Sequence, residues 1–121
     1  MLTSAQVLAF QRDGYVVAPR FSTPAFCAQV ISFAKDELVR EAMPIEFEAD
    51  TRYPGAPESR SAEGGATARR LLMATGRSPE LLAWATRGPL KHLLIQLLGP
   101  GAVLSQAHHN CIMTKQPAFS S

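Results

Sequence analysis

The side chains best suited to chemistry lie close together near the C-terminal end of the chain, in residues 106–115. Successive side chains of an extended strand point to opposite faces, so one face of this segment would carry His109, Cys111, Met113 and Lys115. Histidine, thiol, thioether and ammonium groups on one strand face are unusual for a plain hydrophobic core. The pattern therefore predicts a strand that forms one wall of a polar cavity.

A complete metal site is not predicted among these residues. A mononuclear iron(II) site commonly needs two imidazoles and a carboxylate on one side of the metal. His108 and His109 are adjacent and would point apart in a strand, and no carboxylate follows them. The third histidine, His92, lies on the polar side of a leucine-rich segment. We therefore predict no metal ligand in this chain.

The two cysteines do not indicate a catalytic or cross-linked site. Cys111 has histidines nearby, but a nucleophilic thiol also needs an oriented base, and no third orienting group is apparent. Cys27 and Cys111 show no CxxC spacing, so neither a disulfide framework nor a zinc site is expected. We interpret Cys111 as a buried structural cysteine.

Capping signals predict the elements of the N-terminal third. Thr3 and Gln6 match a capping box and predict a helix that stops at Asp13-Gly14. The β-rich run Tyr15–Val17 predicts a short strand. Thr23-Pro24 combines an N-cap with a first-turn proline and predicts a helix to about Arg40.

The rest of the chain alternates between irregular and helical patterns. Residues 45–67 are the least regular stretch and are long enough to line a site, and within them Ile45–Glu48 alternates and predicts a strand. Ser78-Pro79 predicts the start of a helix to about Thr86, followed by a leucine-striped helix over Leu90–Leu98. Residues 102–115 read as one long strand or two consecutive strands.

Length and composition favour one soluble globular domain. The chain has 121 residues, of which 46% are hydrophobic and 18% charged, with a net charge of +2. Its arginines are scattered, so nucleic-acid binding is not expected, and an anionic ligand among them stays open as an alternative to solvated surface charges. No secretory signal or membrane-length apolar run is present, and we expect a cytoplasmic protein without a membrane partner.

Both ends of the chain resemble one family. The pattern Leu-Thr-x-x-Gln-x-x-x-Phe-x-x-Asp-Gly-Tyr-Val-Val-x-Pro over Leu2–Pro19 resembles the entry segment of the phytanoyl-CoA dioxygenase family. The predicted helix at Thr23–Arg40 takes the place of the helix that follows in that family. The stretch His108–Ser121, with its Lys115-x-Pro117 step, resembles the strand that leads towards the family's iron site.

The resemblance implies an α+β fold, in which N-terminal helices pack outside a double-stranded β-helix, or jelly-roll. Family members use Fe(II) and 2-oxoglutarate to hydroxylate a small organic substrate. Their iron motif, His-x-Asp, follows the Lys-x-Pro step, and residues 1–121 stop before any such motif. We therefore expect the N-terminal part of one such domain, inactive and marginally stable alone, with neither cofactor bound to this chain by itself.

Individual roles also follow from the resemblance. Lys115 matches the family lysine that reaches 2-oxoglutarate, and Met113 shares its strand face as a second cofactor-binding candidate. His109, Tyr53 and Arg70 are the candidates for the substrate wall and rim.

Two other expectations concern partners. Unpaired strand edges in an incomplete jelly-roll make self-association a candidate interaction. A different class of function also stays open, a small helical module that docks on a partner through the Leu90–Leu98 stripe.

Overall fold

Helices and short strands alternate along residues 1–115, the part of the chain that the computed structural model describes. The elements are α1 (Ser4–Asp13), α2 (Pro24–Val39), β1 (Ile45–Phe47), the 3-10 turn η1 (Glu48–Asp50), β2 (Ala68–Leu72), α3 (Ala74–Arg77), α4 (Pro79–Arg87), α5 (Pro89–Leu98) and β3 (Cys111–Met113). The expected mixture of helix and strand is confirmed.

The capping signals of α1 are confirmed. The Thr3 hydroxyl accepts a hydrogen bond from the Gln6 amide at 3.2 Å, and the Gln6 side chain accepts one from the Thr3 amide at 2.9 Å. Gly14 ends the helix in the left-handed region at φ 80°, where glycine avoids the steric conflict of a Cβ atom. Local side chains thus fix both ends of α1.

Helices α2 and α4 also begin where the sequence predicts. The Thr23 hydroxyl accepts from the Phe26 amide at 3.1 Å, and the Ser78 hydroxyl accepts from the Leu81 amide at 3.3 Å. Each helix has proline in its first turn, where the missing amide hydrogen removes no helical bond. The leucine-striped helix is confirmed as α5.

The strands form one antiparallel sheet in the order β1-β2-β3. Ile45 of β1 and Ile112 of β3 lie on either side of Leu71 of β2, and the Leu71 side chain is fully buried. The strand predicted at Ile45–Glu48 is confirmed as Ile45–Phe47, whereas β2 and the short helix α3 were not predicted. Within residues 1–115 this three-stranded sheet is the whole β structure, so the jelly-roll is treated below as a proposal.

Two strand predictions are wrong. Tyr15–Val17 is irregular, and Tyr15 and Val17 stay about two-thirds exposed because no neighbouring strand covers them. In residues 102–115 only Cys111–Met113 pairs with β2. Residues 102–110 are irregular, since a turn at His108 and His109 interrupts the extended backbone.

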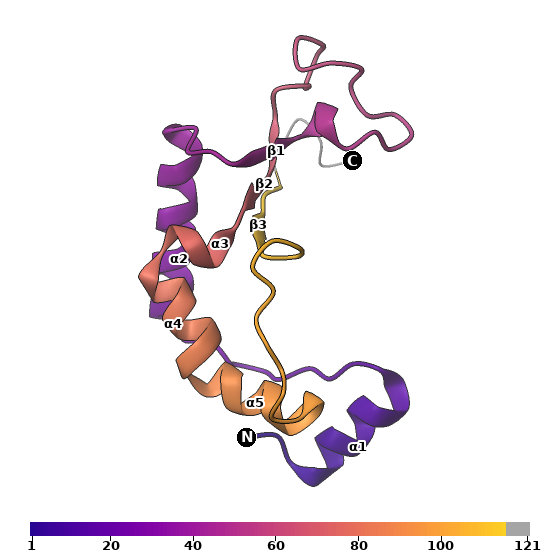
Figure 1. The fold of residues 1–121 in the computed structure, drawn as a ribbon, viewed down its shortest axis with the longest axis vertical. Coiled ribbons are helices and arrows are strands. Elements are labelled where there is room, and N and C mark those ends of the chain that lie inside the picture. The colour runs from indigo at the N-terminus through magenta and orange to yellow at the C-terminus, as the bar shows by residue number, and fades with distance from the viewer. Residues whose placement is uncertain (116–121) are drawn as a thin grey trace.

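The elements are arranged as an open arc (Figure 1). Helices α2, α4 and α5 follow its outer side, and the chain after α5 returns along the inner side to β3. Helix α1 lies at the end of the arc farthest from the sheet. Among the helices of residues 1–115, none combines the length and apolar character needed to span a bilayer.

The helices lie on one side of the sheet. Ile45 lines a hollow together with Leu38 and Val39 of α2. Ile112 lines a second hollow together with Leu81 and Trp84 of α4. The row Ile45, Leu71 and Ile112 therefore faces the helical layer, and the side chains next to these in each strand face the other way.

Arg77 joins the end of α3 to the start of the sheet. Its guanidinium lies 2.8 Å from the Glu37 carboxylate of α2 and donates hydrogen bonds to the backbone carbonyls of Leu72, Ala42 and Pro44. The Arg77 and Glu37 side chains are only 6% and 8% exposed. Because a buried charge is tolerated only when it is paired, this contact fixes α2 against the sheet.

A second long-range contact holds the N-terminus. The Gln96 side chain of α5 accepts a hydrogen bond from the Leu2 amide at 3.0 Å and donates one to the Leu2 carbonyl at 2.8 Å. The Leu2 side chain is buried. Gln96 thus binds both backbone groups of Leu2, as a neighbouring strand would.

Candidate functional site

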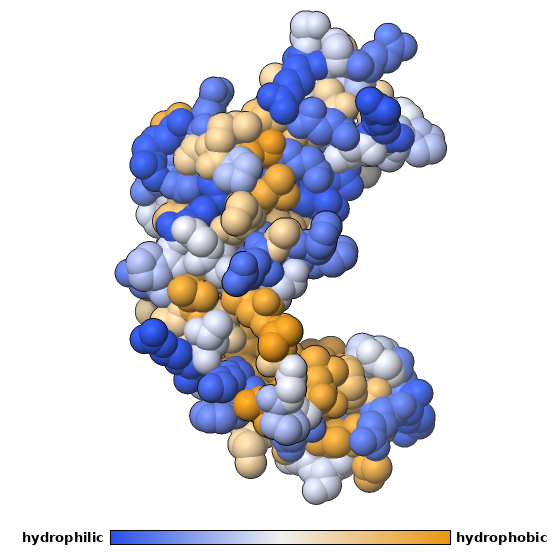
Figure 2. Space-filling model, in the orientation of Figure 1, coloured by the Kyte–Doolittle hydropathy of each residue, from blue (hydrophilic) through white to orange (hydrophobic). Residues whose placement is uncertain are grey.

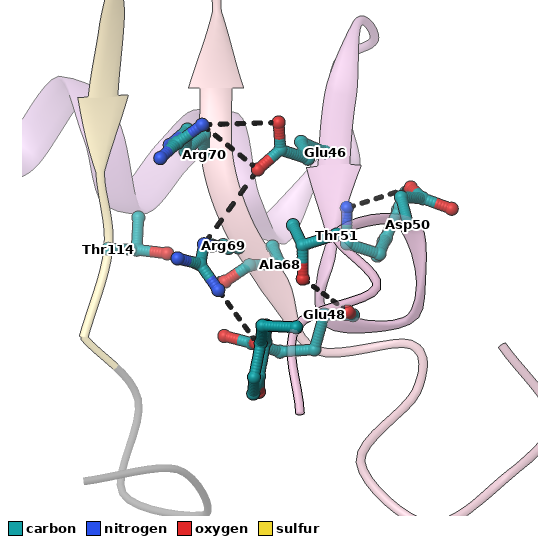
Figure 3. Close-up of polar contacts among 10 residues, drawn as sticks. Glu46, Glu48, Asp50, Thr51, Ala68, Arg69, Arg70 and Thr114 are labelled. Atoms are coloured by element: carbon teal, nitrogen blue, oxygen red, sulfur yellow. Dashed lines mark hydrogen bonds and ion pairs between the residues drawn. The ribbon is translucent and has the colours of Figure 1, made fainter. Parts of the chain in front are cut away.

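Two carboxylates and two guanidiniums meet where β1 and β2 run side by side. We name Glu46, Glu48, Arg69 and Arg70 the charge cluster (Figure 3). The nitrogen-to-oxygen distances are 3.3 Å for Arg70 to Glu46, 3.8 Å for Arg69 to Glu46 and 3.4 Å for Arg69 to Glu48. These side chains are between 11% and 35% exposed, so the charges are shielded from solvent without being sealed from it.

Tyr53 extends the charge cluster into the loop after η1. Its hydroxyl donates a hydrogen bond to the Glu48 carboxylate at 2.8 Å, and the Arg69 guanidinium lies 5.1 Å from the centre of its ring. The hydrogen bond to Glu48 raises the pKa of the Tyr53 hydroxyl, because ionisation would set two negative charges side by side. Tyr53 and Arg70, both predicted to be substrate residues, thus belong to one connected network.

Part of the hydrogen-bonding capacity of the charge cluster is unused. Glu46 Oε1, Arg69 Nε and Arg70 Nε are buried atoms with no hydrogen-bond partner among the described residues. The ion pairs of Glu46 Oε1 with Arg70 Nη1 and Arg69 Nε, at 3.3 and 3.8 Å, are longer than a good charged hydrogen bond. Buried polar atoms are normally satisfied, so these three atoms are exceptions within the sheet.

Met113 lies beside Arg70. Arg70 of β2 is the cross-strand partner of Met113 in β3 and, on its other side, of Glu46 in β1. Side chains at directly paired positions share one face of a sheet. Glu46, Arg70 and Met113 therefore form a row on the face opposite the helices, and Met113 is 55% exposed there.

Lys115 follows two residues after Met113. Thr114, between them, donates its amide to the Arg69 carbonyl at 3.0 Å and its hydroxyl to the Ala68 carbonyl at 2.7 Å, so the backbone still follows β2 at this point. Alternation then places Lys115 on the same face as Met113. The Lys115 side chain is exposed.

The structure separates His109 from Met113 and Lys115. His109 has a φ of 59° in the turn before β3, so the alternation assumed for residues 109–115 does not extend to it. His109 lines a hollow of about 270 Å³ with Trp84 and Leu104, at the opposite end of β3 from Lys115. The prediction that His109 shares their strand face is wrong.

Asn110 holds this turn in place. Its side-chain amide donates to the Thr75 hydroxyl at 2.7 Å and to the carbonyls of Ser105 and Gln106 at 3.0 and 3.2 Å. Its side-chain oxygen accepts from the Thr75 amide at 3.0 Å. Asn110 is buried, and it ties the chain before β3 to α3.

The described residues contain no ready metal site. His, Cys, Asp and Glu side chains do not gather in groups of three anywhere in residues 1–115. His92 is exposed on α5, and the thiols of Cys27 and Cys111 are both free.

The acidic half of the charge cluster was missed from the sequence. Glu46 and Glu48 are alternate residues of a predicted strand, and Arg69-Arg70 is the densest basic pair of the chain. The signal was available in this charge complementarity, but using it requires knowing that the two segments pair.

No protein-family model, curated protein or solved structure matches the chain.

Proposed function

We propose that the chain is the N-terminal part of an Fe(II)/2-oxoglutarate-dependent oxygenase domain that resembles the phytanoyl-CoA dioxygenase family. In this proposal the three-stranded sheet is the beginning of a double-stranded β-helix. The complete domain would hydroxylate a small organic substrate. The chain by itself would be inactive.

The observation that carries the proposal is the one-sided covering of the sheet. The row Ile45, Leu71 and Ile112 faces the helices, whereas the opposite row contains Arg70 and Met113. A jelly-roll encloses its site between two sheets, with the inner faces turned towards each other. A polar, partly exposed face opposite the helical layer is what the inner wall of such a site requires.

Lys115 and Met113 would form the co-substrate side of this wall. The Lys115 ammonium is a compact charge that suits a carboxylate of 2-oxoglutarate. Arg70 and Tyr53, which are tied to Glu46 and Glu48, would form the substrate side. His109, at the other end of β3, would lie at the rim.

The iron would need ligands from outside the described residues. Residues 1–115 offer no suitable group of three side chains, and we derive no reaction step from them. Their part would be to bind and orient the organic molecules. This division of labour makes the proposal testable without assuming that the chain turns over substrate.

The first test is an anaerobic titration of the purified chain with Fe(II) and 2-oxoglutarate, followed by the charge-transfer absorbance of the chelated complex. We expect no band from the 121 residues alone. We also expect the coding sequence after Ser121, in one of the three frames, to specify a Trp-His-x-Asp stretch. A chain extended through that stretch should give the band.

Lys115→Ala in the extended chain tests the assigned role. Loss of a charged hydrogen bond of roughly 1.5–3 kcal/mol should weaken 2-oxoglutarate binding about 10- to 100-fold. Lys91→Ala, which removes an exposed lysine of α5, is the matched control and should leave the affinity unchanged. A band from the unextended chain, or no Trp-His-x-Asp stretch in any frame, contradicts the proposal.

A hollow beside α5 favours a second candidate function, a protein-interaction module. Leu94 and Leu98 of the predicted stripe line a cavity of about 500 Å³ with Val103 and Leu104. Figure 2 shows hydrophobic surface gathered on this inner side of the arc. An amphipathic partner helix would fit such a groove. Absence of the charge-transfer band in the extended chain would favour this candidate.

A further inference from the structure

Strand β3 has one unpaired edge. In the sheet of residues 1–115 it is the last strand and borders only β2. The Thr114 amide donates to the Arg69 carbonyl, so Thr114 is a hydrogen-bonded position of the ladder between β3 and β2. Since hydrogen-bonded positions alternate in antiparallel pairs, Ile112 also directs its backbone groups towards β2. The backbone groups of Cys111 and Met113 consequently point outwards.

We propose that this edge pairs with the same edge of a second copy of the chain, with the two β3 strands antiparallel. The outward groups favour one register, because placing Cys111 of one copy opposite Met113 of the other uses the outward groups of both residues in both copies. The twofold axis then passes between the two Ile112 residues. Such an interface is self-complementary, as a symmetric dimer requires.

The register also continues the hydrophobic face of the sheet. Ile45, Leu71 and Ile112 form one row, and the second copy would add the same row in reverse order. Directly opposed residues of an antiparallel pair point to the same face. The result is a six-stranded sheet with its apolar row unbroken and its polar row, containing Arg70 and Met113, also continuous.

The edge of β3 is short, at three residues, but within the strand no side chain opposes pairing. Soluble proteins commonly protect edge strands with charged side chains, proline or a covering segment as well as by shortness. Cys111, Ile112 and Met113 carry no charge and include no proline. Asn110 fixes the chain before β3 to α3, so the edge is presented in an ordered conformation. The exposed Met113 adds apolar surface.

This proposal does not rest on the proposed function. It depends on the edge of β3 alone and would hold for an interaction module as well. In an oxygenase domain, the next strand of the jelly-roll would compete for the same edge. Measurements on the 121-residue chain therefore test the dimer separately from any iron chemistry.

A cysteine at the twofold axis tests the register. In a background with Cys27→Ser and Cys111→Ser, Ile112→Cys should form a disulfide between copies under mild oxidation. Non-hydrogen-bonded antiparallel partners have Cα atoms about 4.5 Å apart, within the roughly 4.4–6.8 Å range of disulfides. Val103→Cys, at a position 91% exposed and off the strand, is the matched control. We expect at least about tenfold faster cross-linking at position 112.

Met113→Pro tests the hydrogen bonds without a new thiol. It removes an outward amide hydrogen and no bond to β2, so the helical circular-dichroism signal should persist. The dimer dissociation constant from analytical ultracentrifugation should rise at least about tenfold. A wild-type chain that is monomeric at all concentrations, equal cross-linking at positions 112 and 103, or a dimer unaffected by Met113→Pro would each overturn the proposal.

Discussion

Glu37 and Arg77, forty residues apart in the chain, form an ion pair of 2.8 Å in which both side chains are more than nine-tenths buried. The same guanidinium binds the backbone carbonyls of Ala42 and Pro44, which precede β1, and of Leu72, which ends β2. Arg40 also contacts Glu37, so the carboxylate is shared by two guanidiniums. This contact holds the sheet at a fixed position on the helical layer.

Arg77→Met should strongly destabilise the chain. It removes the buried partner of the Glu37 carboxylate, leaving the exposed Arg40, and the donor to three backbone carbonyls, so the cost should approach the roughly 3–5 kcal/mol of a broken buried pair. Urea unfolding followed by circular dichroism measures the loss. Arg12→Ala, which breaks the exposed pair with Asp13, is the control and should cost at most about 1 kcal/mol. Equal effects of the two substitutions would show that the buried pair does not hold the sheet.

Asn110→Asp should loosen the turn before β3. The substitution replaces a donor that serves three acceptors with an oxygen that donates to none of them at neutral pH. Unsatisfied buried groups cost roughly 1–3 kcal/mol. Hydrogen exchange of the Thr75 amide should accelerate accordingly. Gln106→Glu makes the same change from amide to carboxylate at an exposed neighbouring residue and should leave that exchange rate unaltered.

Gly65→Ala should be disruptive while Gly76→Ala is tolerated. A Cβ atom at Gly65 would lie 1.9 Å from the Ser59 carbonyl oxygen, whereas one at Gly76 would meet no atom within 4 Å. The loop over residues 59–65 must therefore open in the first variant. At a compatible site, alanine stabilises by about 0.4–1 kcal/mol through the unfolded state. Thermal unfolding of the two variants should consequently shift in opposite directions.

Acid should weaken the anchoring of this loop through Asp50. Arg60 donates hydrogen bonds to the Asp50 carboxylate at 2.9 and 3.3 Å, and the Phe47 amide donates another at 2.9 Å. The Arg60 bond and then the Phe47 bond lower the pKa of Asp50 below its ordinary 3.8. A lowered folded pKa means that the stabilisation is present above the unfolded value and disappears as pH falls through the folded one.

Carbon-detected NMR titration of the Asp50 carboxylate measures this directly. The midpoint should lie below 3.8 in the wild type. Arg60→Ala should move it upwards because the larger of the two causes is removed. Arg52→Ala removes another exposed arginine, close to Asp50 in the sequence, and should leave the midpoint in place. The same Asp50 midpoint in the wild type and in Arg60→Ala would show that the ion pair does not form.

Helix positions were predictable because their causes are local. Thr3, Thr23 and Ser78 each cap a helix through an amide three residues ahead, and those residues can be read directly from the sequence. Strand β2 was missed because Arg69 and Arg70 make it look like a polar connection. Its pairing depends on residues near positions 45 and 112, which no local pattern specifies.

The candidate site was predicted in part for the same reason. Met113 and Arg70 could be named from residue type, but their direct pairing depends on register. His109 was misplaced because alternation holds only while the backbone stays extended, and its left-handed conformation ends the strand pattern. A left-handed residue that is not glycine is uncommon, so the sequence gives little warning of it.

The contact between Leu2 and Gln96 bears on local unfolding at the N-terminus. It spans 94 residues of sequence and, with limited apolar packing, is what docks the N-terminal helix. Leu8 of that helix remains 64% exposed. Regions with few buried contacts open locally at lower free energy than the core. The N-terminal helix should therefore detach and re-dock as its own cooperative unit, while the sheet and the Arg77 contact stay closed.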